Sequence, residues 1–275
     1  KEASGSMGDD TPVAVLSSHF RPVSHYFRQN FSQVTNPPID SLREDKVMSL
    51  KTRFGNLGNI LDFDNLTEED IFVLDSPILT NSQLQKFKKF FSNKIKVIDC
   101  TFEIDSSLKE RIEEIRVECE TSVREGSTSI ILTDKGIKSN RASIPSALIV
   151  GAVHSHLVKH GLRGYCSLNV ECSDALDTHS FAVLIGVGAT TINPYLAIDS
   201  IYQRYEKKLF GKSDFKDCIR RFKKSIDAGL LKIMSKMGIS VISSYRGGCN
   251  FEAVGLSRAI VSDYFPGMSS RISGI

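Results

Sequence analysis

The sequence has no tryptophan, and its apolar runs all fall well short of the roughly 18 residues that a membrane-spanning helix needs. It also lacks an excess of one charge, because 35 basic and 32 acidic side chains leave a net charge of +3. So small a charge gives no reason to expect nucleic acid or a membrane surface as a partner. The length of 275 residues, with 41% hydrophobic and 24% charged, is typical of a soluble globular protein with one large domain or two small ones.

The six cysteines lack a metal-binding pattern, because no Cys-x-x-Cys pair occurs. In a chain of this size they are most simply reduced thiols of a cytosol-like compartment. Cys166 and Cys172 have a spacing that some iron–sulfur sites use, but no third cysteine follows nearby. We therefore interpret both as small buried hydrophobic residues.

Both ends of the chain are unusual. The sequence begins at Lys1 instead of methionine, and it stops at Ile275 without a tail-like segment. We expect from this that the chain is a piece of a longer protein.

The first part of the chain is rich in turn formers and prolines. Ser6–Pro12 predicts a loop, and Val23–Phe31 has apolar residues at helical spacing. Val34–Asp40 is expected to be extended, because residues before proline avoid the helical region. Ser41 and Glu44 have the spacing of a capping box, which predicts the start of a helix.

The middle of the chain alternates short β-rich stretches with helical ones. The predicted strands are Lys94–Phe102, Ser127–Thr133 and Cys166–Cys172. The predicted helices are Ser107–Glu125, Pro145–His160 and Phe181–Ala189. A repeat of roughly 35 residues of strand plus helix predicts parallel βαβ units with right-handed crossovers. The expected fold class is therefore α/β, either Rossmann-like or like an incomplete barrel.

The last third is predicted to be mainly helical. Thr191–Leu209 and Phe215–Met237 have helical spacing, and Gly238 is expected to end the second helix. Ile239–Tyr245 is predicted to be a strand, and Phe251–Val254 a short helix.

Two patterns in the predicted helical regions have weak chemical signals. His156 and His160 are spaced i, i+4, so one helix face could hold a metal with both of them. No glutamate stands between them as in His-Glu-x-x-His, and solvated or cap-proximal histidines are the simpler interpretation. Gly186-Val-Gly188 resembles half of a dinucleotide loop, but the third glycine is missing and the preceding sequence is predicted to be helical.

Lys86–Lys96 and Arg220–Lys224 are basic clusters that alternate with aromatic residues. Such clusters also occur on ordinary amphipathic helices, and we do not expect nucleic-acid binding from them.

The segment Ser243–Gly248 has a stronger signal. It is predicted to follow a strand and precede a helix, and ligands bind at that edge of α/β sheets. Exposed backbone N–H groups, a glycine pair and Arg246 suit an anionic or flavin-type ligand. The alternative is a tight turn that needs glycine only for its backbone conformation.

Several runs of residues form a set that extends over nearly the whole chain. They are Ser6–Pro12, Gln33–Asp40, Met48–Leu50, Ser76–Pro77, Leu79–Asn81, Ile192–Ala197, Gly229–Lys232, Met234–Ser240, Ser244–Gly247 and Phe251–Ser257. Together and in this order, these runs resemble the large subunit of glutamate synthase. The eight-residue run Gln33–Asp40 is highly specific by itself.

The resemblance implies a place within a longer enzyme. Residues 1–198 resemble the central domain, and residues 199–275 resemble the opening helices and first strand of the FMN-binding (β/α)8 barrel. The family makes glutamate by reductive amination of 2-oxoglutarate at FMN, with ammonia released from glutamine. In this chain the implied role is scaffold and ammonia-tunnel wall, and no catalytic residue is expected in it.

The resemblance also implies cofactors, partners and a location. FMN and an iron–sulfur cluster belong to the full enzyme, and we expect neither in this chain alone. The partners are the amidotransferase and barrel domains, and a flavoprotein subunit or domain with NAD(P)H, or ferredoxin, as electron donor. The implied location is the cytoplasm, or the plastid in a photosynthetic eukaryote.

The residues expected near FMN in the full enzyme are given by the same resemblance. They are Ser243, Ser244, Tyr245, Arg246 and Gly247. The chain departs from the family pattern at Leu176, where an arginine is usual, and at Ser243, where a glutamine is usual. A non-catalytic α/β interaction module is the alternative function.

Overall fold

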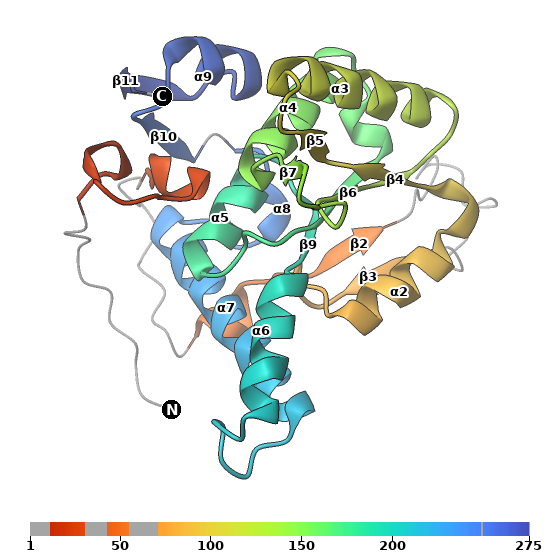
Figure 1. The fold of residues 1–275 in the computed structure, drawn as a ribbon. Coiled ribbons are helices and arrows are strands. Elements are labelled where there is room, and N and C mark those ends of the chain that lie inside the picture. Colours follow the sequence, from red (N-terminus) through yellow and green to blue (C-terminus); the bar gives the residue numbers. More distant parts are fainter. Residues whose placement is uncertain (1–11, 31–42, 55–70, 249, 275) are drawn as a thin grey trace.

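A four-stranded parallel sheet lies at the centre of the computed structural model, which describes residues 12–30, 43–54, 71–248 and 250–274 (Figure 1). Its strands, in spatial order, are β4 (Ile95–Asp99), β6 (Ser129–Thr133), β8 (Ser167–Glu171) and β9 (Thr191–Asn193). The spatial order follows the chain, without the reversal that defines a Rossmann sheet. The predicted parallel βαβ units are thus confirmed.

Helices connect these strands and extend beyond them. The longer ones are α2 (Asn81–Phe90), α3 (Leu108–Arg124), α4 (Ser146–Lys159), α5 (Thr178–Gly186), α6 (Tyr195–Glu206) and α7 (Phe215–Met237). The short ones are α1 (Glu44–Val47), α8 (Ile242–Tyr245) and α9 (Arg258–Tyr264), with 3-10 turns at Ala14–Leu16, Val23–Tyr26, Ser92–Lys94 and Arg163–Tyr165. None of the helices in these described ranges is long and apolar enough to cross a membrane.

Smaller sheets pair segments of the chain that lie outside the central sheet. One contains β1 (Phe27–Gln29), β10 (Phe251–Val254) and β11 (Ser269–Ile272). The others pair β2 (Thr52–Phe54) with β3 (Phe72–Leu74), and β5 (Thr101–Glu103) with β7 (Arg141–Ser143). The antiparallel pairing of β1 with β10 joins parts of the chain that are more than 200 residues apart in the sequence, with Phe27 opposite Ala253.

The central strand β6 separates two hydrophobic clusters. Ile130 and Leu132 belong to the main core, whereas Ile131 faces a smaller cluster that includes Phe54 and Phe87. Successive side chains of a strand point to opposite faces, so one strand serves both clusters. The main core continues from Phe27 to Phe265. Since both faces of β6 are buried, its three middle residues, Ile130–Leu132, are all apolar instead of alternating with polar ones.

Local signals set both ends of α7, of which the end at Gly238 was predicted. The Asp214 side chain accepts a hydrogen bond from the backbone N–H of Asp217 and caps α7. Gly238 ends that helix in the left-handed conformation, at φ +70°. The predictions for α3, α4 and α7 are confirmed to within a few residues.

Four predicted elements are corrected by the structure, and one of them, the helix predicted at Thr191–Leu209, is confirmed as α6 except at its start. Val23–Phe31 is a 3-10 turn followed by β1, and Thr191–Asn193 is a strand that pairs with β8 before the helix begins. Ile239–Tyr245 is not a strand. Only Val241 forms a β-bridge, to Ser49, and Ile242–Tyr245 forms the helix α8.

The fourth correction is Phe251–Val254, which is the strand β10 and not a helix. Its burial alternates with a period of two, because Phe251 and Ala253 both face the core. The predicted features at Ser6–Pro12, Val34–Asp40 and Ser41 lie outside the described residues.

Candidate functional site

The predicted ligand segment forms the helix α8 and the turn after it. The side chains of Ser243 and Ser244 are exposed, whereas Tyr245 is 1% exposed. The Tyr245 hydroxyl donates a hydrogen bond of 2.6 Å to Oε1 of Gln29. Burial raises the pKa of this phenol above its ordinary value. Tyr245 is therefore a packing residue that anchors the segment to β1.

Arg246 follows Tyr245 and has few partners. Its Nε is buried and makes no hydrogen bond within the described part of the chain. Its Nη2 donates a long bond of 3.4 Å to the hydroxyl of Thr52. Burial, and then the charge of Arg163, lower the pKa of the guanidinium to about 10, so it stays protonated at neutral pH. A partly desolvated cation with an unused donor is suited to an anionic group.

His154 on α4 lies beside this arginine and receives a hydrogen bond from a second one. Nε of Arg163 donates to Nδ1 of His154 at 3.0 Å. The remaining guanidinium nitrogens of Arg163 donate to the backbone oxygens of Cys166, at 2.6 Å, and Gly188, at 2.9 Å. Burial, followed by the charges of Arg163 and Arg246, lowers the pKa of His154 to about 4.

Two glycines allow the backbone to approach the His154 ring closely. A Cβ on Gly247, at φ +66°, would lie 2.9 Å from Nε2, and one on Gly188, at φ +127°, would lie 2.4 Å from Nδ1. Gly186 packs in the same way against the Phe251 ring. The pair Gly186 and Gly188 is therefore explained by packing, with no need for a dinucleotide.

Arg246 has a buried donor without a described partner, and His154 and Arg163 lie beside it. The guanidinium nitrogens of Arg163 are already bonded, so Arg163 contributes its charge and the orientation of His154. Because Nδ1 of His154 accepts from Arg163, its Nε2 carries the proton. Such a set can bind and orient an anion, but it offers no nucleophile. Sequence reasoning identified Arg246 and missed the other two.

A row of polar residues at the carboxyl ends of the parallel strands was also missed. Glu171 ends β8, is buried, and pairs with Lys135 at 2.8 Å and with Lys88 at 3.5 Å. Asp134, just after β6, accepts hydrogen bonds from the Ser173 hydroxyl and backbone N–H. The available signal was a carboxylate at or just after the end of β4, β6 and β8, namely Asp99, Asp134 and Glu171. These contacts hold in place the loops that follow β6 and β8.

The remaining candidates are found in ordinary structural roles or elsewhere in the fold. Cys166 and Cys172 are buried free thiols, and burial raises the pKa of both, which makes them unreactive. Four side chains of the basic clusters form ion pairs: Lys88 with Glu171, Lys96 with Glu118, and both Arg220 and Arg221 with Asp217. His156 and His160 stack on α4, with ring centroids 4.3 Å apart.

The described residues form an α/β fold with a parallel four-stranded sheet, and Arg246 is its candidate ligand-binding residue. The family model of the glutamate synthase central domain matches residues 1–257. The chain therefore belongs to the glutamate synthase central domain family, and the predicted resemblance is confirmed.

The sequences of several glutamate synthases support this assignment. The chain is 57% identical to the glutamate synthase [NADPH] large chain of Azospirillum brasilense and 40% identical to that of Bacillus subtilis. It is 38% identical to ferredoxin-dependent glutamate synthase 2 of Synechocystis. Each match covers 100% of this chain but 18% of the relative, so the chain spans less than a fifth of their length.

Among solved structures, the chain is similar to a flavocytochrome b2 double mutant with pyruvate bound. The TM-score is 0.40 at 14% identity, over 63% of this chain and 38% of that one. Similarity at this level is too distant to support an argument about this chain.

Proposed function

We propose that this chain is the scaffold and ammonia-tunnel wall of a glutamate synthase. The whole enzyme would make glutamate from glutamine-derived ammonia and 2-oxoglutarate by reductive amination at FMN, as an oxidoreductase. The observation that carries the proposal is the continuous core from Phe27 to Phe265 in a chain of this family. A rigid core fixes the distance between two sites. A dry conduit is needed because ammonia protonates in water near neutral pH and the ammonium ion is not a nucleophile.

The proposed neighbours follow from the family. They are the amidotransferase domain, the FMN barrel, and a flavoprotein subunit or domain with NAD(P)H, or ferredoxin, as the electron donor. The iron–sulfur cluster belongs to the whole enzyme. We place the central domain at residues 1–198 and the start of the barrel domain at residues 199–275. The location that fits is the cytoplasm, or the plastid in a photosynthetic eukaryote.

The segment Ser243–Gly247 is proposed to lie near FMN in the whole enzyme. The buried Nε of Arg246 has no described partner, which fits an anionic group such as the flavin phosphate. FMN, when bound, supplies the hydride for the reduction. Arg246 would hold negative charge there, Ser243 and Ser244 would offer hydroxyl donors, and Gly247 would let the backbone approach closely.

The experiment is a chimera of the Azospirillum large chain in which this chain replaces the matching segment. We expect the chimera to contain FMN and to form glutamate from glutamine and 2-oxoglutarate. Arg246→Gln in the chimera should weaken FMN binding by about tenfold or more, the loss expected for a charge-assisted hydrogen bond. Arg258→Gln, which changes an exposed arginine, is the matched control and should leave FMN binding unchanged.

Two results would count against the proposal. A chimera that folds and holds FMN but makes no glutamate would favour the alternative, a non-catalytic interaction module. An FMN content that is the same in the Arg246 and Arg258 variants would remove Arg246 from the flavin site and leave the scaffold role in place.

A further inference from the structure

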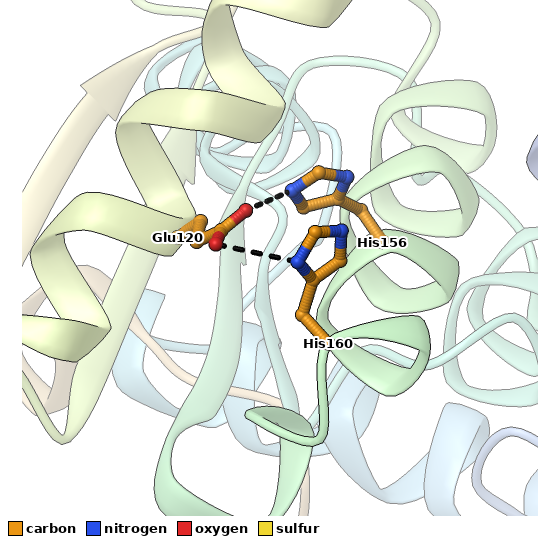
Figure 2. A group of neighbouring side chains, drawn as sticks. All are labelled: Glu120, His156 and His160. Atoms are coloured by element: carbon orange, nitrogen blue, oxygen red, sulfur yellow. Dashed lines mark hydrogen bonds and ion pairs between the residues drawn. The ribbon is translucent and has the colours of Figure 1, made fainter.

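Three potential metal ligands meet between the helices α3 and α4, away from the proposed flavin segment. Figure 2 shows Glu120 of α3 facing His156 of α4 and His160, the residue that caps the C-terminal end of α4. The sequence indicated only the two histidines. Their partner Glu120 is 36 residues before His156, and only the packing of the two helices brings it into place.

The distances suit one small ion. Nε2 of His156 lies 2.7 Å from Oε2 of Glu120, and Nδ1 of His160 lies 3.3 Å from Oε1. One donor atom from each residue lies within 4.8 Å of the other two. Ligands of a tetrahedral Zn²⁺ at 2.0–2.1 Å are separated by about 3.3 Å, so small side-chain movements would complete the site.

The three side chains are partly buried, which limits their motion. The side chains of Glu120 and His156 are 19% and 15% exposed, and that of His160 is 33% exposed. Burial of this degree leaves an entry path from solvent while limiting the rotamers of the ligands. The i, i+4 spacing holds the two imidazoles on one helix face, and their rings lie nearly parallel at 27°.

We propose that Glu120, His156 and His160 form a binding site for a divalent first-row metal ion of the zinc class. Two imidazoles and a carboxylate suit ions of the zinc class, whereas Mg²⁺ and Ca²⁺ bind mainly oxygen ligands. Three protein ligands leave one position for water. The ion would cross-link α3 to α4 and replace the contacts that now join Glu120 to His156 and His160.

One neighbouring charge opposes the ion. Arg124 of α3 donates to Oε1 of Glu120 through Nε at 2.9 Å and Nη2 at 2.8 Å. Its side chain is 55% exposed, so it can turn into solvent when the metal takes that oxygen. The hydrogen bonds from Arg124 and His156 lower the pKa of Glu120, so the carboxylate is already charged. Metal affinity should therefore rise severalfold in the variant Arg124→Gln.

The test is equilibrium dialysis of the untagged 275-residue chain against Zn²⁺, followed by elemental analysis. We expect one zinc per chain in the wild type and a rise in its melting temperature with zinc. His160→Ala and Glu120→Gln should each weaken binding by about tenfold or more. The control is His19→Ala, because His19 is an exposed histidine outside the cluster, and it should bind zinc like the wild type.

Cysteine thiols are the competing ligands, and Co²⁺ distinguishes them. Nitrogen and oxygen ligation gives visible d–d bands without a strong sulfur-to-cobalt charge-transfer band in the near ultraviolet. The proposal is overturned by that sulfur band, by zinc binding that survives both ligand variants, or by the absence of stoichiometric zinc in a wild-type chain whose circular dichroism is native.

Discussion

Arg163 donates a hydrogen bond from Nε to Nδ1 of His154 across 3.0 Å. An imidazole nitrogen that accepts a hydrogen bond carries no proton, so His154 is neutral and has its proton on Nε2. This bond connects the 3-10 turn Arg163–Tyr165 to α4, next to the turn that contains Arg246. It therefore bears on both the stability of the fold and the proposed flavin segment.

The first prediction concerns the pH dependence of stability. The folded pKa of His154 is lowered to about 4 from an ordinary value of 6.5, so between these values the unfolded chain binds the extra proton. Stability from this residue is present above pH 6.5 and is lost as the pH falls towards 4, by about 2–3 kcal/mol in total. Urea denaturation of the wild type and of His154→Gln at several pH values measures the difference.

Carboxyl groups also titrate in this pH range, so the comparison of the wild type with the variant isolates the contribution of His154. The wild type should lose more stability than His154→Gln between pH 6.5 and pH 4. Parallel pH profiles of the two proteins, or an NMR titration of His154 centred at its ordinary pKa, would contradict the prediction.

The second prediction concerns the contact between α5 and β10. A Cβ on Gly186 would lie 2.3 Å from the Phe251 ring, whose side chain is fully buried. Gly186→Ala should therefore destabilise the fold by about 1–3 kcal/mol, the usual result of overpacking. Gly164→Ala is the control, because a Cβ there meets no atom within 4 Å. Equal melting temperatures for the two variants would show that α5 and β10 do not pack as described.

The third prediction concerns the anchor of the proposed flavin segment. Tyr245→Phe removes the buried donor and leaves the partly buried Oε1 of Gln29 without it. The free energy of unfolding should fall by about 1 kcal/mol or slightly more, measured by urea denaturation. Tyr165→Phe changes a tyrosine that is 70% exposed and should have no measurable effect. A loss of the same size in both variants would argue against a specific role for the Tyr245 hydroxyl.

The fourth prediction concerns the isolated chain. We expect the purified 275-residue protein to be colourless, with no flavin absorbance near 450 nm, because under the proposed function the strands that would enclose FMN lie in the rest of the enzyme. Gel filtration after incubation with excess FMN checks this directly. Stoichiometric FMN that stays with the chain would show that residues 1–275 contain a complete flavin site.

The sequence predicted those parts of the fold that depend on local signals. The helix α7 follows from its helical spacing and from Gly238 at its end, and the strand–helix repeat follows from hydrophobic periodicity. The errors fall where distant pairing decides. Phe251–Val254 is a strand because it pairs with β1, which is more than 200 residues earlier in the chain.

The candidate sites show the same division between local and distant signals. Arg246 was identified from its place beside a glycine pair. His154 and Arg163 were not, because they approach Arg246 only through the packing of α4 and the turn Arg163–Tyr165. Likewise, the spacing of the two histidines on α4 was visible in the sequence, while Glu120 on α3 had no pattern of its own.

The fifth prediction tests the central claim, and it uses the chimera of the Azospirillum large chain. The measurement is the amount of free ammonia released for each glutamine hydrolysed in the presence of 2-oxoglutarate and reductant. If this chain is the scaffold and tunnel wall, nearly all the nitrogen should appear in new glutamate, and reductant oxidation should match glutamine hydrolysis. Ammonia that accumulates in solution, while the chimera still hydrolyses glutamine and still converts added ammonia and 2-oxoglutarate into glutamate, would contradict the account.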